Sequence, residues 1–109
     1  MTVIFFMISF DTMSGKEKLL KFRTAIEIVL KSLRKEKDGV SQAKMNSDFA
    51  IQYGFTLNMG RTERNTNFTI ITLHFICDYF KITPLEFFER VDKVTSNEIK
   101  EFLNRKLKN

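Results

Sequence analysis

His74 and Cys77 are the side chains whose types and spacing come closest to nucleophilic chemistry, because an imidazole can activate a thiol. They lie three residues apart on one predicted helix, and no third group completes a set of nucleophile, base and orienting residue. Packing in the core or at its boundary is therefore the better interpretation of both side chains. The carboxylates are scattered, and no glycine-rich phosphate loop occurs. We expect a protein that is not an enzyme and that uses no cofactor.

Four polar side chains are better suited to binding than to catalysis. Gln42 stands at the start of one short predicted helix, and Thr56, Asn58 and Arg61 crowd the start of the next. Helix N-termini attract phosphates, Asn and Gln can pair with adenine and Arg with guanine, and a helix fits the major groove of DNA. A solvated polar face that binds nothing explains this spacing equally well.

The composition predicts one helical domain with a basic surface. Of the 109 residues 43% are hydrophobic, with twelve Phe and no Trp, so we expect one core rich in phenylalanine. Four Gly and one Pro leave most of the chain free to be helical, which predicts an all-α class. The net charge of +5 favours a polyanionic partner, either nucleic acid or an anionic membrane surface, although many basic domains have no such partner. The single cysteine, Cys77, allows no intramolecular disulfide and no common zinc site, and it suits a reducing cytoplasm.

Residues 40–63 are the stretch around which the rest must be arranged. Their pattern predicts two short helices joined by a turn at Gly54. Ser41 is the expected N-cap of the first helix, and Thr56 that of the second, in which Met59 faces inward. Helices shorter than about 12–15 residues are marginal in water, so the flanking segments must supply a core.

The flanking segments show the periodicity of amphipathic helices. Residues 16–37 carry an apolar stripe that is expected to face the core, formed by Leu19, Phe22, Ile26, Val29 and Leu33. Thr69 is expected to cap another helix. The inward residues of that helix are Ile70, Leu73, Ile76, Cys77 and Phe80. These two helices would enclose the short pair.

Two further helices are predicted toward the C-terminus. Thr83 and Pro84 combine an N-cap with proline at the first helical position, and Glu86 completes a capping box. A last amphipathic segment, capped by Thr95 or Ser96, could close the core or meet a second copy of the chain.

Gly60 lies inside the second short helix, where glycine costs about 1 kcal/mol relative to alanine. One physical reason for a glycine there is a close approach of the backbone to something outside the chain.

Residues 1–10 are nearly all apolar, but they lack the basic region and small-residue cleavage site of a targeting signal. They are also far shorter than the roughly 20 residues that span a bilayer. Three interpretations stay open: an arm that pairs with a partner strand, a plug on the helical core, or an over-extended start with Met7 or Met13 as the true beginning.

Three segments carry a family resemblance, namely residues 33–42 (LRKEKDGVSQ), 58–65 (NMGRTERN) and 76–88 (ICDYFKITPLEFF). Over residues 26–91 the chain resembles the XRE family, the Cro and phage-repressor type of helix-turn-helix domain. The resemblance implies a compact five-helix lambda-repressor-like domain at residues 16–92, an apolar arm at 1–15 and an extra amphipathic helix at 93–109. It also implies a cytoplasmic transcription regulator that binds double-stranded DNA as a homodimer.

Carried over by position, the resemblance implies DNA contacts from Gln42, Thr56, Leu57, Asn58, Arg61, Arg64, Asn65 and Asn67. Gln42 would bond phosphate and brace a base-reading side chain. Thr56, Leu57 and Arg61 fall where the recognition helix meets base edges, with Asn58 beside them. The last three residues of the set would lie near the DNA backbone.

Arg34 and Glu63 match an ion pair that links the first and third helices of the family. The chain also departs from the family pattern. The segment before Glu63 is a few residues longer, which predicts a longer second helix or turn. Asn46 stands where a small alanine is usual, Thr62 replaces an aliphatic residue, and Phe68 replaces a loop proline.

The competing hypothesis is a protein-interaction module, such as an antitoxin-like or adaptor subunit. In that case the short helix pair or the C-terminal helix would bind a partner protein. Residues 1–10 and the apolar stripe within residues 99–107 are its best support. Adsorption of the basic tail to an anionic membrane ranks third, because the tail is short and only moderately apolar.

Overall fold

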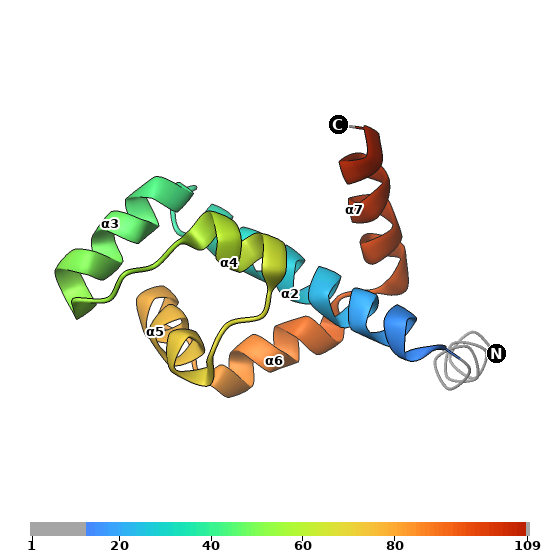
Figure 1. Ribbon diagram of the computed structural model, residues 1–109, viewed down its shortest axis with the longest axis horizontal. Coiled ribbons are helices and arrows are strands. Elements are labelled where there is room, and N and C mark those ends of the chain that lie inside the picture. The colour runs from blue at the N-terminus through green and yellow to red at the C-terminus, as the bar shows by residue number, and fades with distance from the viewer. Residues whose placement is uncertain (1–12, 109) are drawn as a thin grey trace.

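The long helix α2 (Gly15–Glu36) is the element to which most of the others attach (Figure 1). It is followed by α3 (Gln42–Tyr53), α4 (Met59–Asn65), α5 (Ile70–Phe80), α6 (Pro84–Lys93) and α7 (Ser96–Lys108). The computed structural model describes residues 13–108, and within them the chain forms six helices and no strand. The predicted all-α class is confirmed.

Helix α2 contacts α4, α6 and α7. In Figure 1, α3, α4 and α5 gather around the C-terminal half of α2, and α7 projects away from it. The start of α7 lies beside the second half of α2, where Glu98 lines one pocket with Ile28 and Ser32. None of the helices within residues 13–108 is both long and apolar enough to cross a membrane. The apolar arm predicted at residues 1–15 lies outside the described residues except for its last three positions.

Local capping explains where most of the helices begin. Ser14 and Thr83 each form a capping box with the glutamate three residues later, at the starts of α2 and α6. Ser41 and Thr69 are the N-caps of α3 and α5, as predicted. Thr95 exchanges the same pair of hydrogen bonds with the glutamate three residues later, before α7. These starts depend on residues only three positions apart.

Helix α4 begins later than predicted. Asn58, not Thr56, is its N-cap, and Asn58 Oδ1 accepts a hydrogen bond from the backbone N–H of Arg61 at 3.0 Å. Helix α3 has 12 residues, more than the ten or so that its pattern firmly predicts, and its C-cap is Gly54 with φ 61°. Residues 55–58 then connect the two helices. The turn at Gly54 is where it was predicted, so the later start of α4 follows from the connection itself, in which Leu57 is buried and the N–H of Met59 donates to Asn46.

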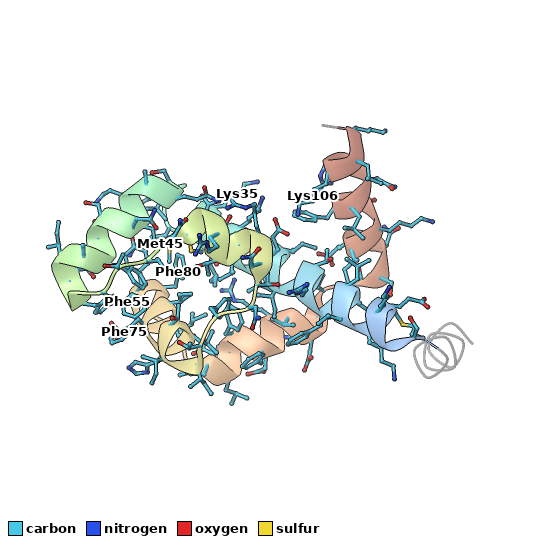
Figure 2. All side chains as sticks on the ribbon, viewed as in Figure 1. Lys35, Met45, Phe55, Phe75, Phe80 and Lys106 are labelled. Atoms are coloured by element: carbon cyan, nitrogen blue, oxygen red, sulfur yellow. The ribbon has the colours of Figure 1, made fainter. Side chains whose placement is uncertain are left out.

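Aromatic rings fill the core between α3 and α5. The ring of the buried Phe49 lies 5.0 Å from that of Tyr53, 6.2 Å from Phe55 and 5.3 Å from Tyr79, measured between centroids. Phe55 and Phe75, which Figure 2 labels near each other, have centroids 5.6 Å apart. Edge and tilted contacts of this kind are favoured by the charge distribution of aromatic rings. Phenylalanine nevertheless contributes less to the core than expected, because Phe49 and Phe87 are the buried ones among residues 13–108, whereas Phe55 and Phe75 are partly buried against it.

Several side chains that were predicted to face the core are exposed. Leu19 is 52% exposed, Phe22 is 49% exposed and Ile70 is 80% exposed. The first two lie on the N-terminal half of α2, which extends beyond α3, α4 and α5 (Figure 1). Ile70 is the first residue of α5, so the body of that helix does not cover it. His74 is also exposed, with its ring centroid 5.3 Å from that of Phe75, so the prediction of core packing for it is wrong.

Helix α7 packs on α2 through one buried carboxylate and a short apolar stripe. Glu27 of α2 is 5% exposed, and its oxygens lie 2.7 Å from Lys106 Nζ of α7 and 3.4 Å from Lys31 Nζ. Lys106 leaves α7 on the side that faces the rest of the molecule (Figure 2). Buried Ile99 and half-buried Phe102 complete the contact. The amphipathic helix therefore packs against its own chain.

Two hydrogen bonds from tyrosine to aspartate join α3 to α5. Tyr53 donates to Asp78 Oδ2 at 2.6 Å, and Tyr79 donates to Asp48 Oδ2 at 2.6 Å. Burial and these hydrogen bonds raise the pKa of both phenols, to about 12 for Tyr53. The two bonds hold α5 against α3 while the phenols are neutral.

We expect Tyr53→Phe to lower the free energy of unfolding by about 1 kcal/mol near pH 8, the contribution of an ordinary hydrogen bond. The difference should disappear with rising pH. The phenol ionises at 10.0 in the unfolded chain and at about 12 in the folded one, so its stabilisation is complete below pH 10 and is lost toward pH 12. Urea unfolding followed by circular dichroism measures both proteins. Tyr79 is present in both proteins, so the difference between their free energies of unfolding reports on Tyr53. A difference that stays constant up to pH 12 would contradict this account.

Candidate nucleic-acid interface

The carboxylate of Glu63 is buried where α2, α3 and α4 meet. Its side chain is 1% exposed, and its oxygens accept hydrogen bonds from Arg34 Nε at 2.5 Å, from Arg34 Nη2 at 3.1 Å and from Gln42 Nε2 at 2.9 Å. Arg34 Nη1 also donates to the backbone carbonyl of Val40 at 3.0 Å. A buried carboxylate needs such partners to offset its desolvation. These contacts fix α4 against α2 and against the start of α3.

Gln42 is the first residue of α3, and its side chain is engaged inside the protein. Its amide nitrogen donates to Glu63, and its Oε1 lies toward α4, 3.4 Å from where a Cβ on Gly60 would be. The side chain therefore braces α4 through the buried carboxylate. One amide hydrogen and the carbonyl oxygen remain available, and contact with phosphate stays a prediction.

Asn46 has a role that the sequence reasoning did not assign. Its Oδ1 accepts a hydrogen bond from the backbone N–H of Met59 at 2.7 Å, so the middle of α3 holds the first residue of α4. Met59 is fully buried beneath this bond, as predicted. A signal was present in the sequence, because Asn46 is a polar residue one position after the buried Met45 of the same helix. A polar residue at a packed position requires a hydrogen-bond partner.

Most of the predicted DNA contacts are exposed on or beside α4. The exposed members are Thr56, Asn58, Arg61, Arg64, Asn65 and Asn67. Leu57 differs, because its side chain is 7% exposed and belongs to the hydrophobic core. The structure contradicts the prediction that Leu57 meets a base edge. Since α4 begins at Met59, Leu57 lies in the preceding connection and packs inward instead of projecting from the helix.

The two arginines of α4 have no partner in the described part of the chain. Arg61 and Arg64 are exposed, and neither side chain forms a hydrogen bond or ion pair within residues 13–108. In contrast, Arg34 and Arg90 are each paired with a glutamate. Like charges three positions apart on a helix repel each other weakly. They also add to a local positive potential, which attracts anions.

The described residues do not indicate a metal site or a reactive thiol. No group of three or more His, Cys, Asp or Glu within residues 13–108 could hold a metal ion. Cys77 is buried, as predicted, and burial raises the pKa of its thiol, with a further rise from the charge of Glu86. A thiol with a raised pKa is a weak nucleophile near neutral pH.

Comparison of the sequence with protein-family models found no match, and comparisons with curated proteins and with solved structures found none either. The interpretation of this surface therefore depends on the geometry of α3 and α4 and on the chemistry of their side chains. The exposed arginines and the bonds that brace α4 are the two features of this surface on which the functional proposal is based.

We expect Glu63→Ala to lower the free energy of unfolding by about 3 kcal/mol, because it leaves a largely buried guanidinium without its partner. That guanidinium belongs to Arg34, whose side chain is 19% exposed. Urea unfolding at neutral pH measures the change.

Glu36→Ala is the matched control for this prediction. Glu36 pairs with Arg90 at 2.7 Å, but the two side chains are 55% and 39% exposed. Removal of an exposed partner should change the free energy of unfolding by less than about 1 kcal/mol. Equal losses in the two variants would contradict the importance of burial at Glu63.

Proposed function

We propose that this protein is a sequence-specific DNA-binding transcriptional regulator of the helix-turn-helix type, similar to the XRE family. In this proposal α3 and α4 are the helix pair, and α4 enters the major groove. The observation that carries the proposal is the pair of Arg61 and Arg64, which are exposed on a short helix and have no partner within residues 13–108. The buried side chain of Glu63 holds this helix on the core. Arginine forms paired hydrogen bonds with guanine and with phosphate.

The bracing of α4 favours binding because it presents the arginines in a fixed place. The helix has seven residues, far fewer than an isolated helix needs for stability in water. The bonds from Arg34 and Gln42 to Glu63, and from Met59 to Asn46, supply the missing stability. A surface that is already ordered loses less entropy when it binds.

The exposed side chains divide into two roles in this proposal. Arg61, Asn58 and Thr56 read base edges, whereas Gln42 and Arg64 contact phosphates. The side-chain oxygen of Asn58, Oδ1, already accepts a hydrogen bond from the backbone N–H of Arg61. The side-chain NH₂ group of Asn58 is therefore left to donate to an acceptor on a base. The net charge of +5 adds a sequence-independent attraction to the duplex.

The proposal includes a lambda-repressor-like arrangement of α2–α6, a homodimer and a cytoplasmic location. It assigns no catalytic activity and no cofactor. Selection of bound duplexes from a random DNA pool tests binding, specificity and dimer geometry together. A selected motif with two symmetric halves about 10 base pairs apart, or a multiple of that, is the expected result. If no sequence is enriched, specific recognition is excluded.

We expect Arg61→Glu to abolish binding to the selected duplex without unfolding the domain, because a carboxylate would replace the guanidinium at the groove. Fluorescence anisotropy measures the affinity and circular dichroism the fold. Arg23→Glu is the control with the same change of net charge. Arg23 is exposed on α2, about 16 Å along the helix axis from Arg34. Because charges at such distances are largely screened, Arg23→Glu should weaken binding only slightly. Normal binding by the Arg61 variant would remove this residue from the interface.

Arg64→Ala should weaken binding to all duplexes by a similar factor, because a phosphate contact carries no sequence information. Measured as log affinity against log salt concentration, the slope should become shallower by about one unit. The same titration with Arg23→Ala should leave the slope nearly unchanged. A loss confined to the selected sequence would instead indicate that Arg64 reads a base.

A protein-interaction module is the second candidate, favoured by apolar side chains exposed on α5 and α6. These are Ile70, Ile71, Leu85 and Phe88, with exposed fractions of 80%, 58%, 71% and 40%. Large apolar side chains that are left exposed can contribute to a surface that binds another protein. Titration with random duplex DNA at two salt concentrations separates the candidates, because the absence of binding at low salt favours the interaction module.

A further inference from the structure

The backbone of α4 does not require a glycine at Gly60. The described glycines with positive φ are Gly39 and Gly54, so the conformation of Gly60 is open to alanine as well. Gly60 is the second residue of α4, and a glycine in a helix is less stable than alanine by about 0.5–1 kcal/mol. The residue therefore costs stability without relieving backbone strain.

Packing does not require the glycine either. A Cβ at this position would lie 3.4 Å from Gln42 Oε1, 3.5 Å from Arg64 Nη1 and 3.5 Å from Asn58 Oδ1. These are ordinary van der Waals distances, and all three atoms are at the ends of side chains that can move. No backbone atom is among these three nearest atoms. The fold can accommodate alanine here.

The three side chains around the missing Cβ are among those that the proposed function assigns to DNA. Gln42 comes from α3, whereas Asn58 and Arg64 come from the cap and the last turn of α4. Because Gly60 has no side chain, the backbone of α4 itself lies half-buried at the centre of this polar group. Glycine is common where a backbone must come close to a ligand.

We infer that Gly60 is the point at which α4 comes closest to the sugar–phosphate backbone of duplex DNA, and that a side chain there would hold the helix away from the groove. This inference rests on the proposed function. The effect is steric and independent of base sequence, so it applies to selected and random duplexes alike. Gly60 is thus a positioning residue for Arg61 and Arg64, which follow it on the same helix.

The test compares Gly60→Ala with Gly15→Ala in the full chain. Gly15 is the first residue of α2, and a Cβ there would meet nothing within 4 Å, so the control makes the same chemical change in open space. Thermal unfolding and affinity for the selected and a random duplex are measured for both variants. Gly60→Ala should unfold at the same or a higher temperature and lose about tenfold or more in affinity for both duplexes, equivalent to at least 1.4 kcal/mol. Gly15→Ala should bind like the unmodified protein.

Each other outcome overturns the inference in a distinguishable way. If the unmodified protein binds and Gly60→Ala binds equally well, the close approach is wrong while the proposed function stands. If Gly60→Ala unfolds at a clearly lower temperature, the glycine serves the fold. If Gly15→Ala loses affinity to the same extent, the effect is not local to α4. If the unmodified protein binds no duplex, the proposed function fails and this inference fails with it.

Discussion

The buried carboxylate of Glu63 is the charge on which the arrangement of α2, α3 and α4 depends. A carboxylate removed from water costs several kcal/mol unless cations and donors surround it. Here Arg34 and Gln42, which precede Glu63 by 29 and 21 residues, both donate hydrogen bonds to its carboxylate. These bonds restrict how the three helices can pack together. Since α4 has only seven residues, this neutralisation and the bond from Met59 to Asn46 determine whether the helix exists at all.

Within residues 13–108, the ion pairs that join different helices all include a residue of α2. Arg34 pairs with Glu63 of α4, Glu36 with α6 and Glu27 with α7. The long helix thus uses charges of both signs to attach its neighbours. In these pairs the cationic side chains Arg34, Arg90 and Lys106 are already bound to glutamates of the same chain. The arginines of α4 are left out of this scheme. A cation that the fold does not use is available to a polyanion, which is why the exposed face of α4 dominates the functional interpretation.

The added length of α3 has a structural use. Its last residue, Tyr53, packs against Phe49 and donates to Asp78 of α5, so the final turn ties the helix pair to the rest of the core. A shorter helix ending before Tyr53 would lose this connection. The final turn of α3, which Gly54 ends, therefore helps to hold the helix pair on the rest of the core.

The sequence by itself determined the helical class and most helix starts. Ser41, Thr69 and Thr83 cap helices through hydrogen bonds to residues three positions away, so nothing distant is needed to place them. Tertiary structure decided which apolar residues are buried and which polar ones are engaged. Phe22 and Leu57 are both apolar, but only Leu57 has helices around it to exclude water. Burial and long-range hydrogen bonds depend on partners that are distant in sequence, and local patterns do not specify those partners.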